Sequence, residues 1–312
     1  MVRIFRTNDG NVHQISEAQE GSWIALTDPT ATEISEIAEQ FQIDVDHLRA
    51  PLDEEERSRI EVEDNYTLIL VDIPMIEERN DKDWYGTIPM GIIITDELIF
   101  TVCLEDTPVL RTFMDGRVRD FFTYKRTRFI LQILYKNASI YLHYLRQIDK
   151  KSEQVERNLH KSQRNQELMD MLELEKSLIY LSTSLRGNEV VLEKLMRNTS
   201  IPRYEDDEEL LEDVIIENKQ AIEMAKIYSD ILTGMMDTFA SVISNNLNIV
   251  MKILSVITIV LTIPNIITSA FGMNVGGIPL STHPLGFWII CGLALALTLI
   301  VGIIIGRTKS FR

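Results

Sequence analysis

The chain has 312 residues, 45% of them hydrophobic, and a formal net charge of −16. This length allows more than one domain, and so negative a charge argues against a nucleic-acid partner while favouring cations and cationic partners. Only Cys103 and Cys291 are present, far apart in sequence, which excludes a disulfide framework and fits a reducing compartment.

Residues 1–115 are expected to form an α/β domain. Three apolar runs rich in β-branched residues are bounded by charged residues, Gly or Pro and predict strands over residues 67–73, 90–95 and 98–102. Residues 31–48 carry apolar side chains at helical spacing, with Thr30 or Thr32 as the N-cap, and predict a helix.

Residues 116–203 are expected to form a helical hairpin. No proline lies between Pro108 and Pro202, and two successive stretches show apolar faces at helical spacing. The turn between the two helices is predicted within residues 154–166.

A stalk helix is predicted over residues 204–252, and it continues into the next segment with Gly234 as its only weak point. A single helix over residues 208–271 would be roughly 95 Å long. Such a helix needs neighbours along its length, so the pattern favours oligomeric packing.

The carboxy-terminal region predicts a transmembrane hairpin. Residues 253–306 contain no Asp, Glu, Lys or Arg, and turn-forming residues divide them at 272–284. The two remaining segments, 253–271 and 285–306, are each long enough to cross a bilayer of roughly 30 Å.

Charge sets the expected orientation of these spans. The nearby basic residues are Lys252 and those of the tail 307–312, which predicts that both termini are cytoplasmic in a multi-pass protein of the cell (inner or plasma) membrane. No signal peptide is visible in residues 1–30. The region before residue 250 holds 27 basic and 47 acidic residues, a net charge of −20.

The first span carries a polar stripe that a simple lipid anchor does not need. Two interleaved seven-residue series keep small and mostly polar side chains on one face of a left-handed supercoil. The series are Asn248, Ser255, Thr262 and Ser269, and Met251, Thr258, Asn265 and Gly272. A ring of identical copies would turn this stripe toward a pore; alternatively, the hydroxyls bond their own preceding carbonyls or make helix contacts.

With these features, the chain resembles the CorA superfamily of divalent-cation channels and transporters. The resemblance rests on Gly272-Met273-Asn274 at the end of the first span, on Glu54-Glu55-Glu56-Arg57-Ser58-Arg59-Ile60-Glu61, and on Val250-Met251-Lys252-Ile253-Leu254 at the membrane entry. It implies an α+β membrane protein assembled as a funnel-shaped homopentamer. An α/β cytosolic domain, a stalk helix lining the pore and an outer second span complete the implied architecture.

The resemblance also implies roles for individual residues. Gly272, Met273 and Asn274 would form the outer mouth and bind the water shell of Mg²⁺, which dehydrates reluctantly. Inner polar rings would be formed by Asn248, Thr258, Thr262 and Asn265. Met251 and Leu254 would form an apolar constriction. Asp213, paired with Asp81 or Asp83 of a neighbouring subunit, would hold regulatory Mg²⁺; the alternative for Asp213 is a solvated helix charge.

Ion identity stays open between two metals. The outer-loop pattern Gly276-Gly277-Ile278-Pro279 is similar to the ZntB-like branch, which implies Zn²⁺ and possible proton coupling as the alternative. The five histidines are scattered in sequence and predict no tight zinc site, so Mg²⁺ is preferred. A membrane-tethered coiled-coil or sensor module is the second alternative, and no catalytic motif indicates an enzyme.

Overall fold

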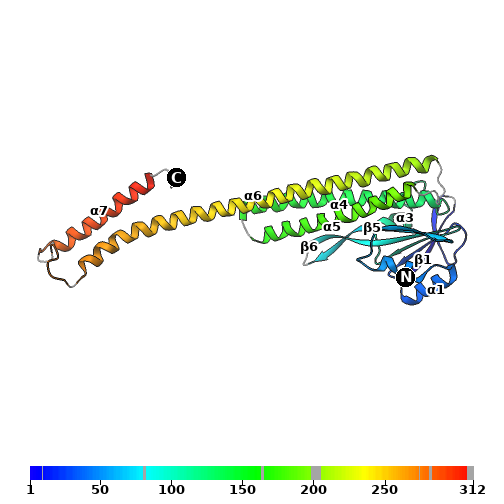
Figure 1. Ribbon diagram of the computed structural model, residues 1–312, viewed down its shortest axis with the longest axis horizontal. Helices are drawn as coiled ribbons and strands as arrows, with labels where there is room; N and C mark the ends of the chain where they lie inside the picture. Colours follow the sequence, from blue (N-terminus) through cyan, green and yellow to red (C-terminus); the bar gives the residue numbers. More distant parts are fainter. Residues whose placement is uncertain are drawn as a thin grey trace. The chain divides into compact units, whose positions relative to one another are not determined.

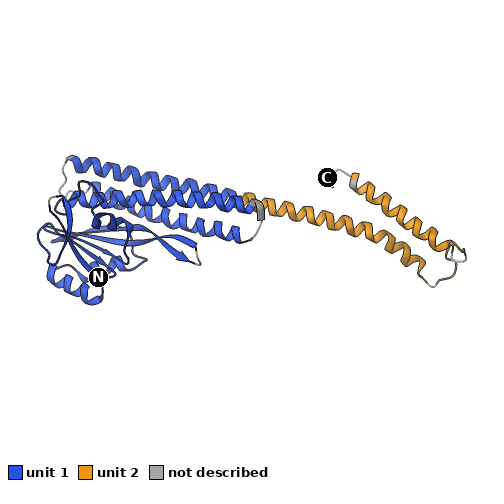
Figure 2. Cartoon of the chain, turned by 180° about the vertical axis from the view of Figure 1, so that it is seen from behind, with its two compact units in different colours: residues 1–236 blue, residues 237–312 orange. Residues whose placement is uncertain are grey.

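The computed structural model describes residues 1–8, 10–79, 82–162, 165–197, 205–273, 275–280 and 283–307. The chain divides into two compact units, Met1–Met236 and Asp237–Arg312, which are coloured separately in Figure 2. The first unit contains a sheet with helices packed on it (Figure 1).

The sheet has seven strands in the order β2-β1-β3-β7-β6-β5-β4. The strands are β1 (Val2–Asn8), β2 (Asn11–Ile15), β3 (Trp23–Thr27), β4 (Arg59–Val62), β5 (Tyr66–Arg79), β6 (Lys82–Thr95) and β7 (Ile99–Cys103). β3 and β7 are parallel, and the other neighbouring pairs are antiparallel. The predicted α/β character of the soluble part is therefore confirmed.

Both faces of the central strands of this sheet are buried. Successive side chains of a strand point to opposite faces, so Leu68 and Leu70 pack in one cluster while Ile69 and Val71 pack in the other. The first cluster is closed by helices α1 (Ala31–Phe41) and α2 (Val45–Arg49). The second is closed by α3 (Pro108–Met114), α4 (Arg126–Ser162) and α5 (Asn165–Arg197).

The prediction of a single helix over residues 31–48 is wrong, because α1 and α2 are separate. Thr30 caps α1 as predicted, in a capping box with Glu33. Gln42 then adopts a left-handed conformation with φ of 55°, and Asp44 caps α2 by accepting a hydrogen bond from the Asp46 backbone N–H. The left-handed residue ends α1 while leaving Ile43 buried in the core.

Strands β5 and β6 are each 14 residues long and extend well past the predicted runs. A proline normally interrupts a strand, yet Pro89 lies within β6 opposite Asp72 of β5. Pairing between β6 and β7 begins only at Met90, so the missing N–H of Pro89 faces no partner strand.

Side chains from α4 and α5 satisfy the outward-facing backbone of Asp72, because β4 pairs with β5 only over residues 67–70. The Asp72 N–H donates to Oδ1 of Asn188 at 2.8 Å, and its carbonyl oxygen accepts from Nδ2 of the same residue at 2.8 Å. Asn137 Nδ2 and the Tyr141 hydroxyl also donate to this carbonyl, at 2.9 and 3.2 Å. This buried polar network fastens the helices to the sheet.

The longest helix, α6 (Glu205–Phe271), has 67 residues and a length of about 100 Å. A long helix is thus confirmed, and it continues through Gly234 and Pro264. In the first unit its apolar side chains join the core beside α4 and α5; they are Leu211, Val214, Ala221, Ala225 and Leu232.

The last helix, α7 (Gly286–Arg307), confirms the predicted carboxy-terminal apolar helix. Both α6 and α7 are long and apolar enough to cross a membrane. In the charge-free part of α6, Leu261 and Ile266 are 64% and 62% exposed. Such a surface requires lipid or protein neighbours in place of water.

Candidate ion pathway

The predicted polar stripe lies along the carboxy-terminal half of α6, within the second unit (orange in Figure 2). The eight residues predicted to line a pore, seven of which belong to the stripe, are all exposed in the single chain; they are Asn248, Met251, Leu254, Ser255, Thr258, Thr262, Asn265 and Ser269. The helix leaves this face available to a neighbour or to water, and a role in lining a pore stays a prediction.

Hydroxyl groups on the stripe bond to the preceding turn of the same helix. Ser255 Oγ donates to the Met251 carbonyl at 2.8 Å, Thr258 Oγ1 to that of Leu254 at 2.8 Å, and Thr262 Oγ1 to that of Thr258 at 2.7 Å. These bonds use each hydroxyl proton and leave the oxygen as an acceptor. The surface they create resembles a row of carbonyl oxygens, which can accept hydrogen bonds from the waters around a cation.

Asn265 is the most polar residue deep in the predicted span. It is exposed, and it follows Pro264, whose ring removes one helical N–H donor. Thr268 Oγ1 donates to the Pro264 carbonyl at 2.9 Å and lies 3.1 Å from the Asn265 carbonyl. An amide in hydrocarbon is costly unless it faces protein or water, so this side chain requires a polar neighbour.

The helix ends at the predicted outer-mouth motif. The Gly272 N–H bonds to the carbonyls of Thr268 at 2.9 Å and Ser269 at 3.2 Å, and a Cβ at Gly272 would lie 3.2 Å from the Thr268 oxygen. Glycine therefore fits this tight end. Met273 is 56% exposed, while Asn274 lies outside the described residues.

The acidic residues predicted to bind a regulatory ion lie in the first unit. Asp213 is exposed on α6, beside the buried Val214. Asp83, on β6, already pairs with Lys151 of α4, whose Nζ lies 2.7 Å from Oδ2. Asp81 lies outside the described residues. A regulatory metal at these positions stays a prediction.

Sequence reasoning missed one cluster of metal-ligand residues. His47 of α2, Glu61 of β4 and Glu63 after β4 bring one ligand atom each to within 4.8 Å of one another. His47 Nε2 is 3.0 Å from Glu61 Oε2. The histidines are scattered in sequence, but the β4 pairing with β5 and the α1–α2 break bring His47 to these carboxylates. The spacing of Glu61 and Glu63, two apart at a strand end, was the available signal.

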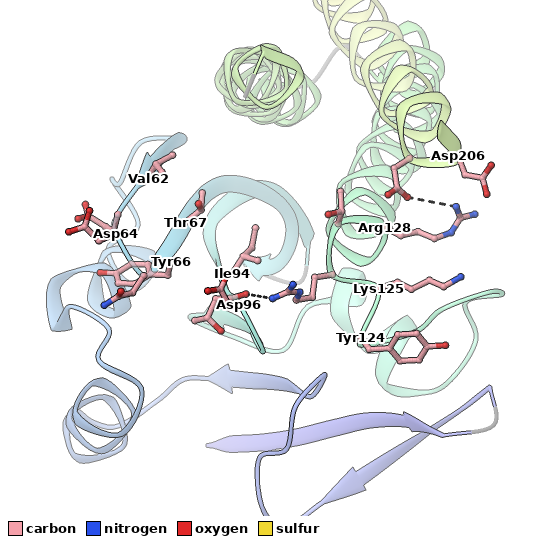
Figure 3. A pocket seen from close by; sticks show the side chains of 16 residues that line it. Val62, Asp64, Tyr66, Thr67, Ile94, Asp96, Tyr124, Lys125, Arg128 and Asp206 are labelled. Carbon is pink, nitrogen blue, oxygen red and sulfur yellow. Dashed lines mark hydrogen bonds and ion pairs between the residues drawn. The ribbon is translucent and has the colours of Figure 1, made fainter. Parts of the chain in front are cut away.

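A cleft of about 930 Å³ lies beside this cluster in the first unit. In Figure 3, Val62, Asp64 and Tyr66 lie on one side of it, and Tyr124, Lys125 and Arg128 lie on the other. Arg128 Nη1 is 3.9 Å from Asp207 Oδ1, and Glu63 is part of the wall. Acidic and basic groups both line the cleft, and it gives water access to the Glu63 side of the cluster.

Comparison with known proteins identifies the family. The family model described as "CorA-like Mg2+ transporter protein" matches residues 18–307. The chain is 28% identical over 295 residues to the cobalt/magnesium transport protein CorA of Methanocaldococcus jannaschii, covering 92% of this chain and 90% of that protein. Identity to the protein of the same description from Thermotoga maritima is 23%, covering 87% of this chain and 78% of that one.

Among solved structures, the complete CorA magnesium transporter of Methanocaldococcus jannaschii aligns with a TM-score of 0.85 and 26% identity. The alignment covers 99% of this chain and 98% of that chain. The family match therefore extends over the α/β domain, the long helix and the carboxy-terminal apolar helix. This chain belongs to the family of CorA-like Mg²⁺ transporter proteins.

Proposed function

We propose that this protein is a homopentameric channel that passes Mg²⁺ across the cell membrane along a pore lined by α6. The single observation that carries the proposal is the exposed stripe of small polar side chains on α6, running up to Gly272 in a member of the CorA-like family. Co²⁺ is a second expected cargo, since the relatives are cobalt/magnesium transport proteins.

The chemistry of the stripe fits a hydrated divalent cation. Mg²⁺ holds its water shell tightly, so a pore that strips no water needs acceptors for water protons rather than anionic ligands. Ser255, Thr258 and Thr262 direct their own protons into the helix and present acceptor oxygens. Asn265 adds an amide oxygen on the same face.

Selection would occur at the two ends of this path. We place a ring of Asn274 amides, with Gly272 and Met273, at the outer mouth, where they would hydrogen-bond the waters of an arriving ion. Met251 and Leu254, 52% and 55% exposed in the single chain, would form the apolar constriction near the cytoplasmic end. A narrow apolar ring can close a pore by losing its water.

The membrane arrangement follows from charge. Residues 253–271 and 285–306 would be the two spans of a hairpin, with Lys252 and Arg307 on the cytoplasmic side. Both termini would then be cytoplasmic, and the acidic first unit would attract cations on that side of the membrane.

Regulation is proposed at the stalk. Asp213 would bind Mg²⁺ between subunits when the cytosolic concentration is high, and the bound ions would screen repulsion among the acidic first units and favour the closed pore. Because Asp83 already pairs with Lys151, its use as a second ligand requires that ion pair to open.

The test is ion flux into liposomes that hold the purified full-length protein. Asn274→Ala is compared with wild type and with Thr298→Ala, a control on α7 whose hydroxyl bonds the Ala294 carbonyl at 2.7 Å. Mg²⁺ flux lost only in Asn274→Ala supports the proposal. Flux of Zn²⁺ alone, driven by a pH gradient, would favour the ZntB-like alternative, and no flux of either ion would favour a tethered module.

A further inference from the structure

The cluster of His47, Glu61 and Glu63 lies outside the stripe, on the edge of the sheet where β4 pairs with β5. A tetrahedral site with bonds of roughly 2.0–2.2 Å needs ligand atoms a little more than 3 Å apart. Here the atoms lie within 4.8 Å of one another, and His47 Nε2 and Glu61 Oε2 are 3.0 Å apart. Small side-chain rotations would therefore bring all three to one ion.

A contact on the other ring nitrogen, Nδ1, orients the imidazole of His47. Its Nδ1 is 2.7 Å from the Tyr66 hydroxyl oxygen, which also accepts a hydrogen bond from the Asp44 N–H at 3.1 Å. If Nδ1 carries the ring proton and donates it to Tyr66, the lone pair of Nε2 points at the carboxylates. Histidines that bind metals are oriented by such a partner on the other ring nitrogen.

The two carboxylates have different surroundings. A hydrogen bond from Arg59 lowers the pKa of Glu61, and this guanidinium contacts Oε1 while Oε2 faces His47. Within the described part of the chain, Glu63 makes no ion pair, and it lines the cleft of about 930 Å³. The positive charge of Arg59 opposes a cation, and two carboxylates offset it.

We propose that His47, Glu61 and Glu63 bind one Zn²⁺ or a similar first-row divalent ion, at a site separate from the transport path. One imidazole and two carboxylates with an open fourth position for water suit zinc, whereas Mg²⁺ prefers oxygen ligands alone. A bound ion would tie α2 to the edge strand β4. The inference does not depend on the proposed pore.

The test uses full-length protein in detergent, titrated with Zn²⁺ to one ion per chain and examined by X-ray absorption and by calorimetry. Glu63→Gln leaves the His47–Glu61 contact in place. It therefore removes one proposed ligand without breaking an ion pair that could support the fold. His47→Gln removes the nitrogen ligand. His13→Gln, an exposed change on β2, and His283→Gln, in the second unit, are the matched controls.

We expect an imidazole nitrogen in the zinc shell of wild type and of both controls, and its loss in His47→Gln. Zinc affinity should fall at least about tenfold in Glu63→Gln and His47→Gln. Circular dichroism without metal checks that each variant is folded. Unchanged affinity in folded Glu63→Gln, a nitrogen signal that persists in His47→Gln, or no zinc bound by wild type would each overturn the proposal.

Discussion

Replacing Asp72 by Asn should stabilise the protein at neutral and alkaline pH. Asp72 lies on β5 beneath α4 and α5, and burial raises the pKa of its carboxyl from the ordinary 3.8 to about 6, although hydrogen bonds from Ser184 and Ser58 act in the opposite direction. The native state thus binds a proton at Asp72 more tightly than the unfolded chain does. Asn keeps the shape and hydrogen-bonding groups but carries no charge.

The sign and size of the change in the free energy of unfolding follow from the difference between the native and unfolded pKa of Asp72. A group with a raised native pKa contributes stability that is fully present below its unfolded pKa and is lost as pH rises through its native pKa. The shift from 3.8 to about 6 corresponds to roughly 3 kcal/mol as an upper bound. The free energy of unfolding of Asp72→Asn should exceed that of wild type by up to this amount at about pH 8, and should approach it near pH 3.

Thermal unfolding of the full-length protein in detergent, followed by tryptophan fluorescence between those pH values, measures the effect. At roughly 2–4 °C per kcal/mol, the midpoint of Asp72→Asn should lie several degrees above wild type at the alkaline end. Glu36→Gln, an exposed change on α1 outside the Asp72 network, is the control for the loss of one acidic side chain. A variant that is less stable at all pH values, or a difference that does not grow with pH, would refute the reasoning.

Three further predictions concern the cap, the stripe and the stalk. Thr30→Ala removes the capping box of α1 and should lower the free energy of unfolding by about 1 kcal/mol in urea titrations; an unchanged midpoint would contradict it. Asn265→Leu should leave the oligomer intact by size-exclusion chromatography but lower Mg²⁺ flux about ten- to hundredfold, and normal flux would remove this residue from the path. Asp213→Asn should raise the cytosolic Mg²⁺ concentration needed to halve the flux; an unchanged inhibition curve would leave Asp213 a solvated helix charge.

The helices and strands with a clear pattern of apolar residues could be predicted from the sequence. The long helix α6 and the apolar helix α7 were predicted because charge is absent from residues 253–306 and no breaker interrupts the preceding helical pattern. The core strands were found from their β-branched runs. The full length of these strands was not predicted, because a proline such as Pro89 normally interrupts a strand. Only the strand pairing shows that the missing N–H of Pro89 would have no partner strand.

The features that the sequence did not reveal depend on tertiary contacts. The left-handed Gln42 separates α1 from α2, and no residue type there marks the break as glycine would. His47 meets Glu61 and Glu63 only because the sheet brings β4 beside α2, so scattered positions in sequence concealed a cluster. The stripe residues were predicted by spacing, and their acceptor oxygens became evident only from the hydroxyl hydrogen bonds.

The most direct test of the central claim is Mg²⁺ flux through the reconstituted full-length protein, measured with wild type and Asn274→Ala at equal amounts of assembled oligomer. The account predicts that wild type conducts Mg²⁺ and that the substitution abolishes this flux while Thr298→Ala retains it. Equal flux in Asn274→Ala and wild type would contradict a pathway that passes the Gly272-Met273-Asn274 mouth.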